Sequence, residues 1–257
     1  MLSLIRRIFR RFFCLFLGSL VSPFVYAEFA DTIERIKPSI VVVGTYKKTN
    51  SPQFVLRGTG FVVGNGNIVA TNAHVVPDSA ASDAPALVIQ ARNERGEPQV
   101  RRARLLQRDR DHDLAIISIE GPALPALKLQ NSDSVREGLS IGFTGFPIGG
   151  ALGFSPVTHR GIVSSITPIA LPGGNAQQLN EKLIQRIKSG AFNIFQLDAT
   201  AYPGNSGSPV FDVETGNVIG VINMVFIKGS KEAALSQPSG ITYAIPVNFL
   251  AELLKQR

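Results

Sequence analysis

The sequence contains one cysteine among its 257 residues, and that cysteine, Cys14, lies in an apolar leader at the N-terminus. The rest of the chain therefore has no disulfide and no thiol nucleophile. The three histidines, His74, His112 and His159, are scattered and have no cysteine ligands beside them, so we expect no metal site and no cofactor. A domain of this size without disulfides must be held together by its hydrophobic core alone, which is feasible for about 230 residues.

Long hydrophobic runs are also missing. The apolar run "FFCLFLGSLVSPFVYA" has about 16 residues and contains Pro23, whereas a membrane-spanning helix needs roughly 20. A basic start, a short apolar core and small residues before a cut after Ala27 are typical of a secretory signal. We therefore predict a signal peptide over residues 1–27 and an exported domain, periplasmic or secreted, over residues 28–257. An uncleaved leader that attaches the protein to the membrane is the alternative.

Acidic residues do not balance the basic ones, and the formal net charge is +7. Four arginines of this excess belong to the leader, so the remaining chain carries about +3. A second cluster of seven arginines runs from Arg92 to Arg110, interleaved with Glu94, Glu97 and Asp109. We predict a solvated hairpin face, with a polyanion-binding patch as the alternative. No aromatic residues typical of RNA-binding modules lie nearby, so we expect no nucleic-acid partner.

What the sequence has in abundance is short apolar runs separated by Gly, Pro, Asn and Asp, such as "FVLRGTGFVVG", "NIVATNAHVV" and "DLAIISIE". Roughly a dozen such strands, with a hairpin turn at Glu214–Asn217, predict an all-β barrel or sandwich. Helical signals are few. Asp31, with Glu34 three residues later, predicts the N-cap of a short helix before a strand that follows Pro38. Residues 175–189 and the final "PVNFLAELLKQR" predict two further amphipathic helices.

A serine, a histidine and an aspartate stand in contexts that suit nucleophilic catalysis. Ser206 lies in "PGNSGSPV", His74 at the end of a strand, and Asp113 at the start of a strongly apolar one. A hydroxyl nucleophile needs a base, and histidine is suited to that role because its ordinary pKa is near neutral pH. The base in turn needs a carboxylate that fixes its tautomer. Each motif alone is more typical of a turn or a strand end.

The residues around the serine add a second indication. The N–H groups of Gly204 and Ser206 are candidates for binding a developing oxyanion, with Asn205 between them. Gly204 lets the backbone turn so that its N–H can face a substrate carbonyl. Gly207 keeps the space beside the serine clear.

The motifs "TNAHVV", "DLAII", "GIVSSI", "DATAYPGNSGSPV" and "GITYAIPVNFL" occur in the order found in trypsin-like serine peptidases of the HtrA/Do type. The chain resembles that family over roughly residues 29–250. The resemblance implies two perpendicular six-stranded antiparallel β-barrels with the active site between them. It implies His74 as base, Asp113 as orienting residue, Ser206 as nucleophile and residues 204–206 as the oxyanion loop. His112 and His159 fall outside these positions.

The sequence departs from the family pattern in three places. Ser208 stands where the family usually has glycine, and we expect activity to survive this small change. Members usually continue into a PDZ domain, whereas this sequence ends at Arg257, so we do not expect peptide-gated control. The segment from Thr167 to Asn193 looks longer than the corresponding family loop. A regulatory or partner-contacting loop and a packed insertion both stay open for it.

The resemblance also allows a prediction of the substrate pocket. Its floor is expected at Thr200, six residues before the serine, where a Lys- or Arg-selective pocket would need a carboxylate. Asp198 lies two positions too early for that role. The pocket walls are expected to come from Ala201, Met224, Val225 and Phe226. Because these residues are mainly apolar, we predict broad cleavage after small or medium aliphatic residues.

Together these features predict a serine endopeptidase that acts on unfolded or damaged proteins in the cell envelope. Two alternatives remain. One is a peptide-binding or chaperone-like module on a protease scaffold, and the other is a processing protease with one partner substrate. Family members are often trimers joined through their N-terminal segments, which here would use Phe29.

Overall fold

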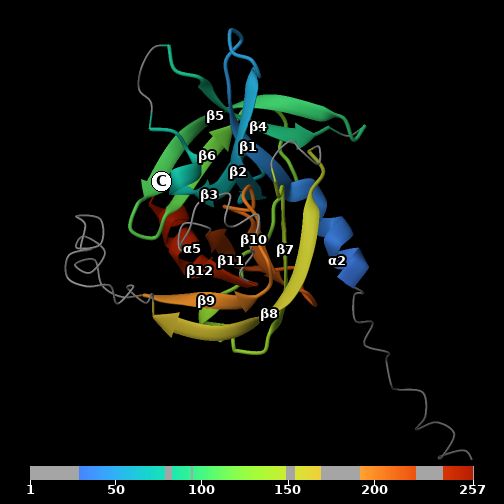
Figure 1. The fold of residues 1–257 in the computed structure, drawn as a ribbon, viewed down its shortest axis with the longest axis vertical. Coiled ribbons are helices and arrows are strands. Elements are labelled where there is room, and N and C mark those ends of the chain that lie inside the picture. The colour runs from blue at the N-terminus through green and yellow to red at the C-terminus, as the bar shows by residue number, and fades with distance from the viewer. Residues whose placement is uncertain are drawn as a thin grey trace, which may run out of the picture.

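The structure, a computed structural model, describes residues 29–78, 83–93, 95–148, 154–168, 192–223 and 240–256. Within these ranges the chain forms two closed barrels of six antiparallel strands (Figure 1). The first barrel consists of β1 (Ile40–Tyr46), β2 (Phe54–Val63), β3 (Ile68–Asn72), β4 (Ala86–Arg92), β5 (Pro98–Asp109) and β6 (Leu114–Ile119). The second consists of β7 (Ser140–Gly145), β8 (Val157–Pro168), β9 (Asn193–Asp198), β10 (Pro209–Asp212), β11 (Val218–Asn223) and β12 (Ile241–Pro246). The prediction of two six-stranded barrels is confirmed.

The two barrels share one strand order. The first barrel runs β1-β2-β3-β6-β5-β4, and the second repeats this order as β7-β8-β9-β12-β11-β10. The sequence contains no visible repeat, because a barrel needs only a pattern of buried apolar positions, which many different sequences satisfy. The structural repeat creates two equivalent halves whose loops meet at their junction.

Apolar side chains on both faces of the strands explain the near-continuous hydrophobic runs. In β1, Val41 and Val43 belong to the core of the first barrel, whereas Ile40 and Val42 belong to a core that also includes Phe211 of the second barrel. Successive strand residues point to opposite faces, so a run such as "IVVV" fills the barrel and the junction together. The junction core therefore holds the two barrels against each other beside the candidate site.

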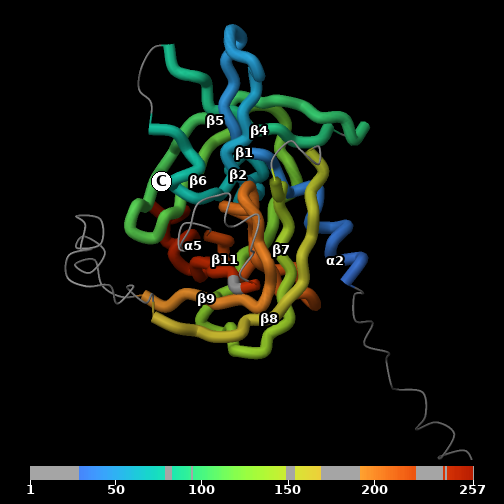
Figure 2. Tube along the Cα trace, in the orientation of Figure 1, coloured from blue at the N-terminus to red at the C-terminus, as the bar shows by residue number. Residues whose placement is uncertain are grey.

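Among the described residues, two α-helices flank the barrels (Figure 2). Helix α5 (Val247–Lys255) contacts β5 and β6 of the first barrel and β11 and β12 of the second, and it confirms the predicted C-terminal helix. Helix α2 (Phe29–Ile36) already contains Asp31, so the assignment of Asp31 as its N-cap is wrong. The ring of Phe29 packs 6.5 Å from that of Phe211, which gives the first residue of the helix an apolar contact. Asp31 instead lies in the first turn, where a negative charge favours the helix dipole.

The turns agree with the sequence patterns. Gly216 has a φ of +74° in the predicted turn between β10 and β11, and its N–H donates to the Asp212 carbonyl at 2.8 Å.

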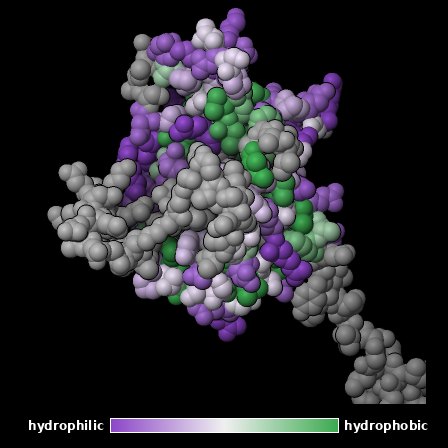
Figure 3. Space-filling view, viewed as in Figure 1, coloured by the Kyte–Doolittle hydropathy of each residue, from purple (hydrophilic) through white to green (hydrophobic). Residues whose placement is uncertain are grey.

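The arginine cluster lies on the hairpin of β4 and β5, where Arg108 and Arg110 both pair with Asp78. Hydrophilic residues cover the outer end of the first barrel in Figure 3. The Arg110 side chain is 72% exposed and that of Arg108 only 11%, so of these two arginines only Arg110 fits the solvated-face interpretation.

Several predictions concern residues outside the described ranges. They are the leader over residues 1–27, the helix over residues 175–189, and the pocket walls at Met224, Val225 and Phe226. Among the described residues, no helix is both long and apolar enough to cross a bilayer.

Candidate active site

His74 lies at the junction end of the first barrel. Strand β3 ends at Asn72, and the chain turns at once into a short 3-10 helix, Ala73–Val75, that carries the histidine. The N–H of Ala73 donates to the Asp113 carbonyl at 3.0 Å. The His74 side chain keeps 34% of its surface exposed, so one edge of the imidazole faces solvent. The position suits a base that must meet a substrate.

Asp113 is joined to His74 by two hydrogen bonds. Its Oδ2 lies 2.6 Å from His74 Nδ1, and its Oδ1 accepts the backbone N–H of His74 at 2.9 Å. The Asp113 side chain is only 9% exposed. An ionised carboxylate can only accept hydrogen bonds, so Nδ1 is the donor and Nε2 of His74 stays available as a base. This is the contact that the predicted base and its orienting carboxylate require, and the two roles stay a prediction.

Two further features hold the Asp113 carboxylate. Asn223, the last residue of β11, donates its Nδ2 to Asp113 Oδ2 at 2.9 Å, which links the second barrel to a residue of the first. Asp113 has a φ of +53°, in the left-handed region that aspartate tolerates better than most residues. The sequence analysis missed Asn223. The only signal was a polar residue at the end of the apolar run "NVIGVIN".

The loop that carries Ser206 is folded tightly on itself. Gly204 and Gly207 have φ values of +104° and +87°, which glycine adopts without strain. Asn205 donates its N–H to the Tyr202 carbonyl, and Ser208 donates its N–H to the Asn205 carbonyl, both at 2.9 Å. These two bonds close tight turns before and around the serine, which is itself 6% exposed.

Residues outside the loop hold its remaining carbonyls. Ile148 donates its N–H to the Pro203 carbonyl at 2.7 Å. Thr59 donates its hydroxyl to the Gly204 carbonyl at 2.7 Å and its N–H to the Ser206 carbonyl at 2.9 Å. Because each peptide unit is planar, a bound carbonyl also fixes the direction of the N–H in the same unit.

The N–H groups of the loop divide into two sets. Those of Asn205 and Gly207 donate to backbone carbonyls, the second of them to Ile222 at 3.0 Å. Those of Gly204 and Ser206 donate to none of the described residues. The two amides left available are therefore the pair that the sequence predicts for an oxyanion.

A chain of hydrogen bonds connects the Ser206 loop to Asp113, the partner of His74. The N–H of Gly207 donates to the carbonyl of Ile222, whose neighbour Asn223 donates to Asp113. Within the described residues, no hydrogen bond joins the Ser206 hydroxyl to His74. Such bonds are often long in substrate-free enzymes and tighten when substrate binds.

Only part of the predicted pocket lies in the described ranges. Ala201 is buried, and its N–H donates to the Thr242 hydroxyl at 3.0 Å. That hydroxyl donates in turn to the Ala199 carbonyl at 2.6 Å, so Thr242 fixes the segment that contains Thr200. The pocket role of these residues stays a prediction.

The other two histidines lie in different surroundings. His112 Nδ1 lies 2.6 Å from Asp109 Oδ2, and its ring stacks on Phe249 of α5 with centroids 3.9 Å apart. His159 stacks on Phe143 at 4.7 Å, and burial lowers its pKa below the ordinary histidine value. Neither ring is hydrogen-bonded to His74, Asp113 or Ser206 in the described part of the chain.

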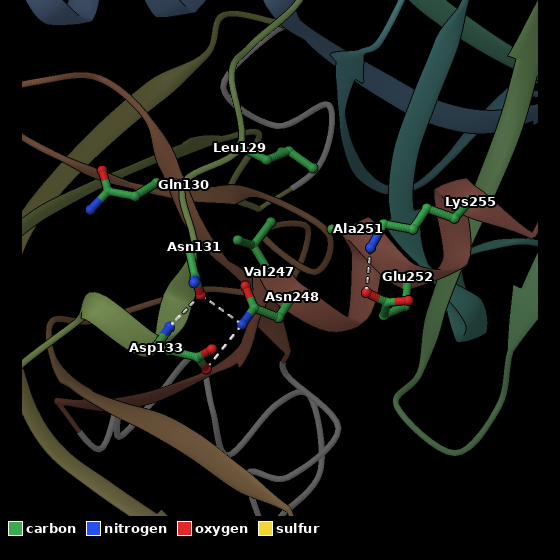
Figure 4. Close-up of a pocket in the computed structure, with 9 residues that line it drawn as sticks. All are labelled: Leu129, Gln130, Asn131, Asp133, Val247, Asn248, Ala251, Glu252 and Lys255. Atoms are coloured by element: carbon green, nitrogen blue, oxygen red, sulfur yellow. Dashed lines mark hydrogen bonds and ion pairs between the residues drawn. The ribbon is translucent and has the colours of Figure 1, made fainter.

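A separate surface cavity of about 390 Å³ lies between α5 and the segment that joins the barrels (Figure 4). At its polar end, Asn248 Nδ2 donates to Asn131 Oδ1 and Asp133 Oδ1, at 2.9 Å and 3.0 Å. The polar groups there are bonded to one another, and the cavity contains none of the candidate catalytic residues.

Across the described ranges, no group of three or more His, Cys, Asp or Glu side chains is arranged to hold a metal ion.

Comparisons with known proteins agree with this geometry. A family model described as "Trypsin-like peptidase domain" matches residues 58–221. A "Probable periplasmic serine endoprotease DegP-like" of Pseudomonas putida is 30% identical over 199 residues, which cover 77% of this chain and 34% of that protein. A protein of the same description from Hahella chejuensis is 28% identical over 261 residues, covering 89% of this chain and 48% of that protein.

Similar solved structures are also proteases of the HtrA type. The structure titled "HtrA-type protease AlgW with tripeptide" matches with a TM-score of 0.62 and 26% identity, covering 89% of this chain and 63% of that one. The chain spans about a third to a half of the length of the two curated relatives. The family match alone covers more than half of the chain, and it includes His74, Asp113 and Ser206. The chain therefore belongs to the trypsin-like peptidase family, and the relatives it resembles are of the HtrA and DegP type.

Proposed function

We propose that this chain is a serine endopeptidase in which Ser206 is the nucleophile, His74 the general base and Asp113 the orienting carboxylate. The observation that carries the proposal is the buried Asp113 carboxylate at 2.6 Å from His74 Nδ1, at the junction that also holds the Ser206 loop. The pair leaves Nε2 of His74 as the proton acceptor. A hydroxyl becomes a useful nucleophile at neutral pH only when such a base takes its proton.

The reaction follows from these roles. Ser206 Oγ attacks the carbonyl carbon of the peptide bond while its proton passes to His74 Nε2, and the carbonyl oxygen becomes an oxyanion. The N–H groups of Gly204 and Ser206 bind that oxyanion. When the C–N bond breaks, His74 returns the proton to the leaving amine, and an acyl-enzyme remains on Ser206. Water then attacks the ester with His74 again as base, which releases the carboxylic acid and restores the serine.

We propose that the pocket accepts small or medium aliphatic side chains before the cut. Thr200 at its floor has no charge, and Ala201 is small and buried, so neither offers a partner for a basic side chain. The walls at Met224, Val225 and Phe226 are an expectation from the sequence. A library of peptides with varied residues before the cut measures this preference. Strong cleavage after Lys or Arg would contradict it.

The setting of the activity is proposed from the relatives. Two of them carry the word "periplasmic" in their names, which agrees with the predicted signal peptide over residues 1–27. We propose export to the cell envelope and unfolded or damaged proteins as substrates. A dedicated processing protease has the same chemistry, so a cleavage profile over a whole envelope proteome separates the two. Many unrelated substrates support the first, and a single substrate supports the second.

A peptide-binding module on the same scaffold is the second candidate. It is favoured by Ser208, which stands directly beside the Ser206 loop in place of the usual glycine. A fluorophosphonate, which labels only an activated serine, tests both candidates. Labelling of the full chain, lost in Ser206→Ala and kept in Ser208→Gly, supports the enzyme. No labelling of the full chain, together with tight binding of peptides, supports the binding module.

A further inference from the structure

We propose that Thr59 is a positioning residue of this active site, and that its hydroxyl holds the Ser206 loop in the conformation that stabilises the oxyanion. The inference rests on the proposed function of the Gly204 and Ser206 amides. Thr59 itself is placed to touch neither substrate nor the reacting atoms, since its polar groups are bonded to the protein.

Every polar group of Thr59 is engaged. The hydroxyl donates to the Gly204 carbonyl at 2.7 Å and accepts the N–H of Phe146 at 3.0 Å. The backbone N–H donates to the Ser206 carbonyl at 2.9 Å, and the Thr59 carbonyl accepts the Thr71 hydroxyl at 2.7 Å. The residue is 0% exposed, so water cannot replace these bonds when one of them is lost.

The contact joins the two barrels. Thr59 lies on β2 of the first barrel, whereas Ser206 belongs to the loop before β10 of the second. The two backbones are so close that glycine is needed on both sides. A Cβ on Gly58 would lie 2.9 Å from the Ser206 carbonyl oxygen, and one on Gly207 would overlap the carbonyl oxygen of Thr59. Thr59 therefore links the first barrel directly to the backbone of the Ser206 loop.

The geometry explains how the hydroxyl acts at a distance. The Gly204 carbonyl shares a peptide unit with the N–H of Asn205, and the Ser206 carbonyl shares one with the N–H of Gly207. Both N–H groups are bonded within the second barrel, so Thr59 completes the attachment of each unit at its other end. These two fixed units flank the unit that contains the N–H of Ser206. Because peptides are planar, that N–H has little freedom to turn away from the oxyanion.

The test separates positioning from simple stability. Thr59→Val keeps the shape of the side chain and removes the hydroxyl, and Thr59→Ser keeps the hydroxyl. Thr144→Val is the matched control, because Thr144 is also 0% exposed and its hydroxyl, within the described ranges, bonds only to that of Thr158, at 2.8 Å. Each full-length protein is assayed for kcat and KM on a peptide amide and for melting temperature. Affinity for a peptide boronic acid, which forms a tetrahedral adduct with the serine, is measured alongside.

We expect Thr59→Val to lower kcat by roughly 10- to 100-fold with little change in KM, since an unpaired buried carbonyl disturbs the loop. Boronic acid affinity should fall by a similar factor. Thr59→Ser should restore most of both, and Thr144→Val should lose stability without losing kcat. If the valine variant does not fold, Thr59→Cys takes its place in the comparison with Thr59→Ser. The cysteine thiol is a weaker hydrogen-bond donor than the hydroxyl, so a partial loss of kcat is expected.

Wild-type kcat in Thr59→Val, or an equal loss in Thr144→Val, would overturn the inference and leave the proposed function intact. A wild-type protein that neither turns over peptide nor reacts with a fluorophosphonate would overturn the proposed function, and this inference with it.

Discussion

Asp113 Oδ2 lies 2.6 Å from His74 Nδ1 and accepts a second hydrogen bond, at 2.9 Å, from the side chain of Asn223. The aspartate and histidine belong to the first barrel and the asparagine to the second. The orientation of the candidate base therefore depends on both barrels being in contact. A domain arranged in this way keeps the candidate catalytic residues aligned only when both barrels are folded.

The first prediction concerns this pair. Asp113→Asn removes the acceptor for the Nδ1 proton, which favours the wrong tautomer and lowers kcat by about 10⁴-fold. The measurement is kcat on a peptide amide, with circular dichroism to verify the fold. Asp109→Asn is the matched control, because Asp109 Oδ2 makes the same 2.6 Å contact with His112 Nδ1 in the same loop. Equal losses in the two variants would show that the Asp113 effect is general destabilisation.

The second prediction uses two glycines with the same backbone angle. Gly138 and Gly207 both have a φ of +87°, but a Cβ on Gly138 meets nothing within 4 Å, whereas one on Gly207 overlaps the Thr59 carbonyl oxygen. Gly138→Ala should cost about 1–2 kcal/mol of stability, from the backbone alone, and keep its activity. Gly207→Ala should lose more stability and most of its activity. Thermal unfolding and kcat measure the difference. Similar behaviour of both variants would argue against a tight contact beside Ser206.

The third prediction concerns pH and His159. Burial lowers the pKa of His159 in the folded protein, so the unfolded chain binds a proton first as the pH falls. Stability is therefore lost as the pH drops through the ordinary histidine value of about 6.5 toward the lower folded value, and the loss stops below it. His159→Phe, which keeps a ring against Phe143, should lose less melting temperature between about pH 7.5 and pH 5 than the wild type. All other titrating groups are the same in both proteins. Identical losses would refute the assignment.

The sequence predicted the parts of this molecule that local patterns specify. The strands follow from short apolar runs with turn residues between them, and His74, Asp113 and Ser206 stand in motifs that can be recognised without a fold. The hairpin turn at Glu214–Asn217 is confirmed for the same reason: a glycine with positive φ is needed there. The start of α2 was wrong because the contact of Phe29 with the second barrel cannot be seen in the local sequence.

Thr59 and Asn223 show what local patterns cannot provide. Thr59 reads as one residue of a β-strand in "LRGTGFVV", and Asn223 as the polar end of another strand. Their hydrogen bonds to Gly204 and Asp113 exist only because the two barrels meet. A residue acquires such a role from a partner more than 100 positions away in the chain, and neither periodicity nor turn chemistry carries that information.

The most direct test of the account is turnover of unfolded casein by the full-length chain, measured beside Ser206→Ala and the neighbouring control Ser208→Gly. The account predicts cleavage by the wild type and by Ser208→Gly, and a loss of about 10⁴- to 10⁶-fold in Ser206→Ala. Equal cleavage by the wild type and Ser206→Ala would contradict the assignment of Ser206 as the nucleophile.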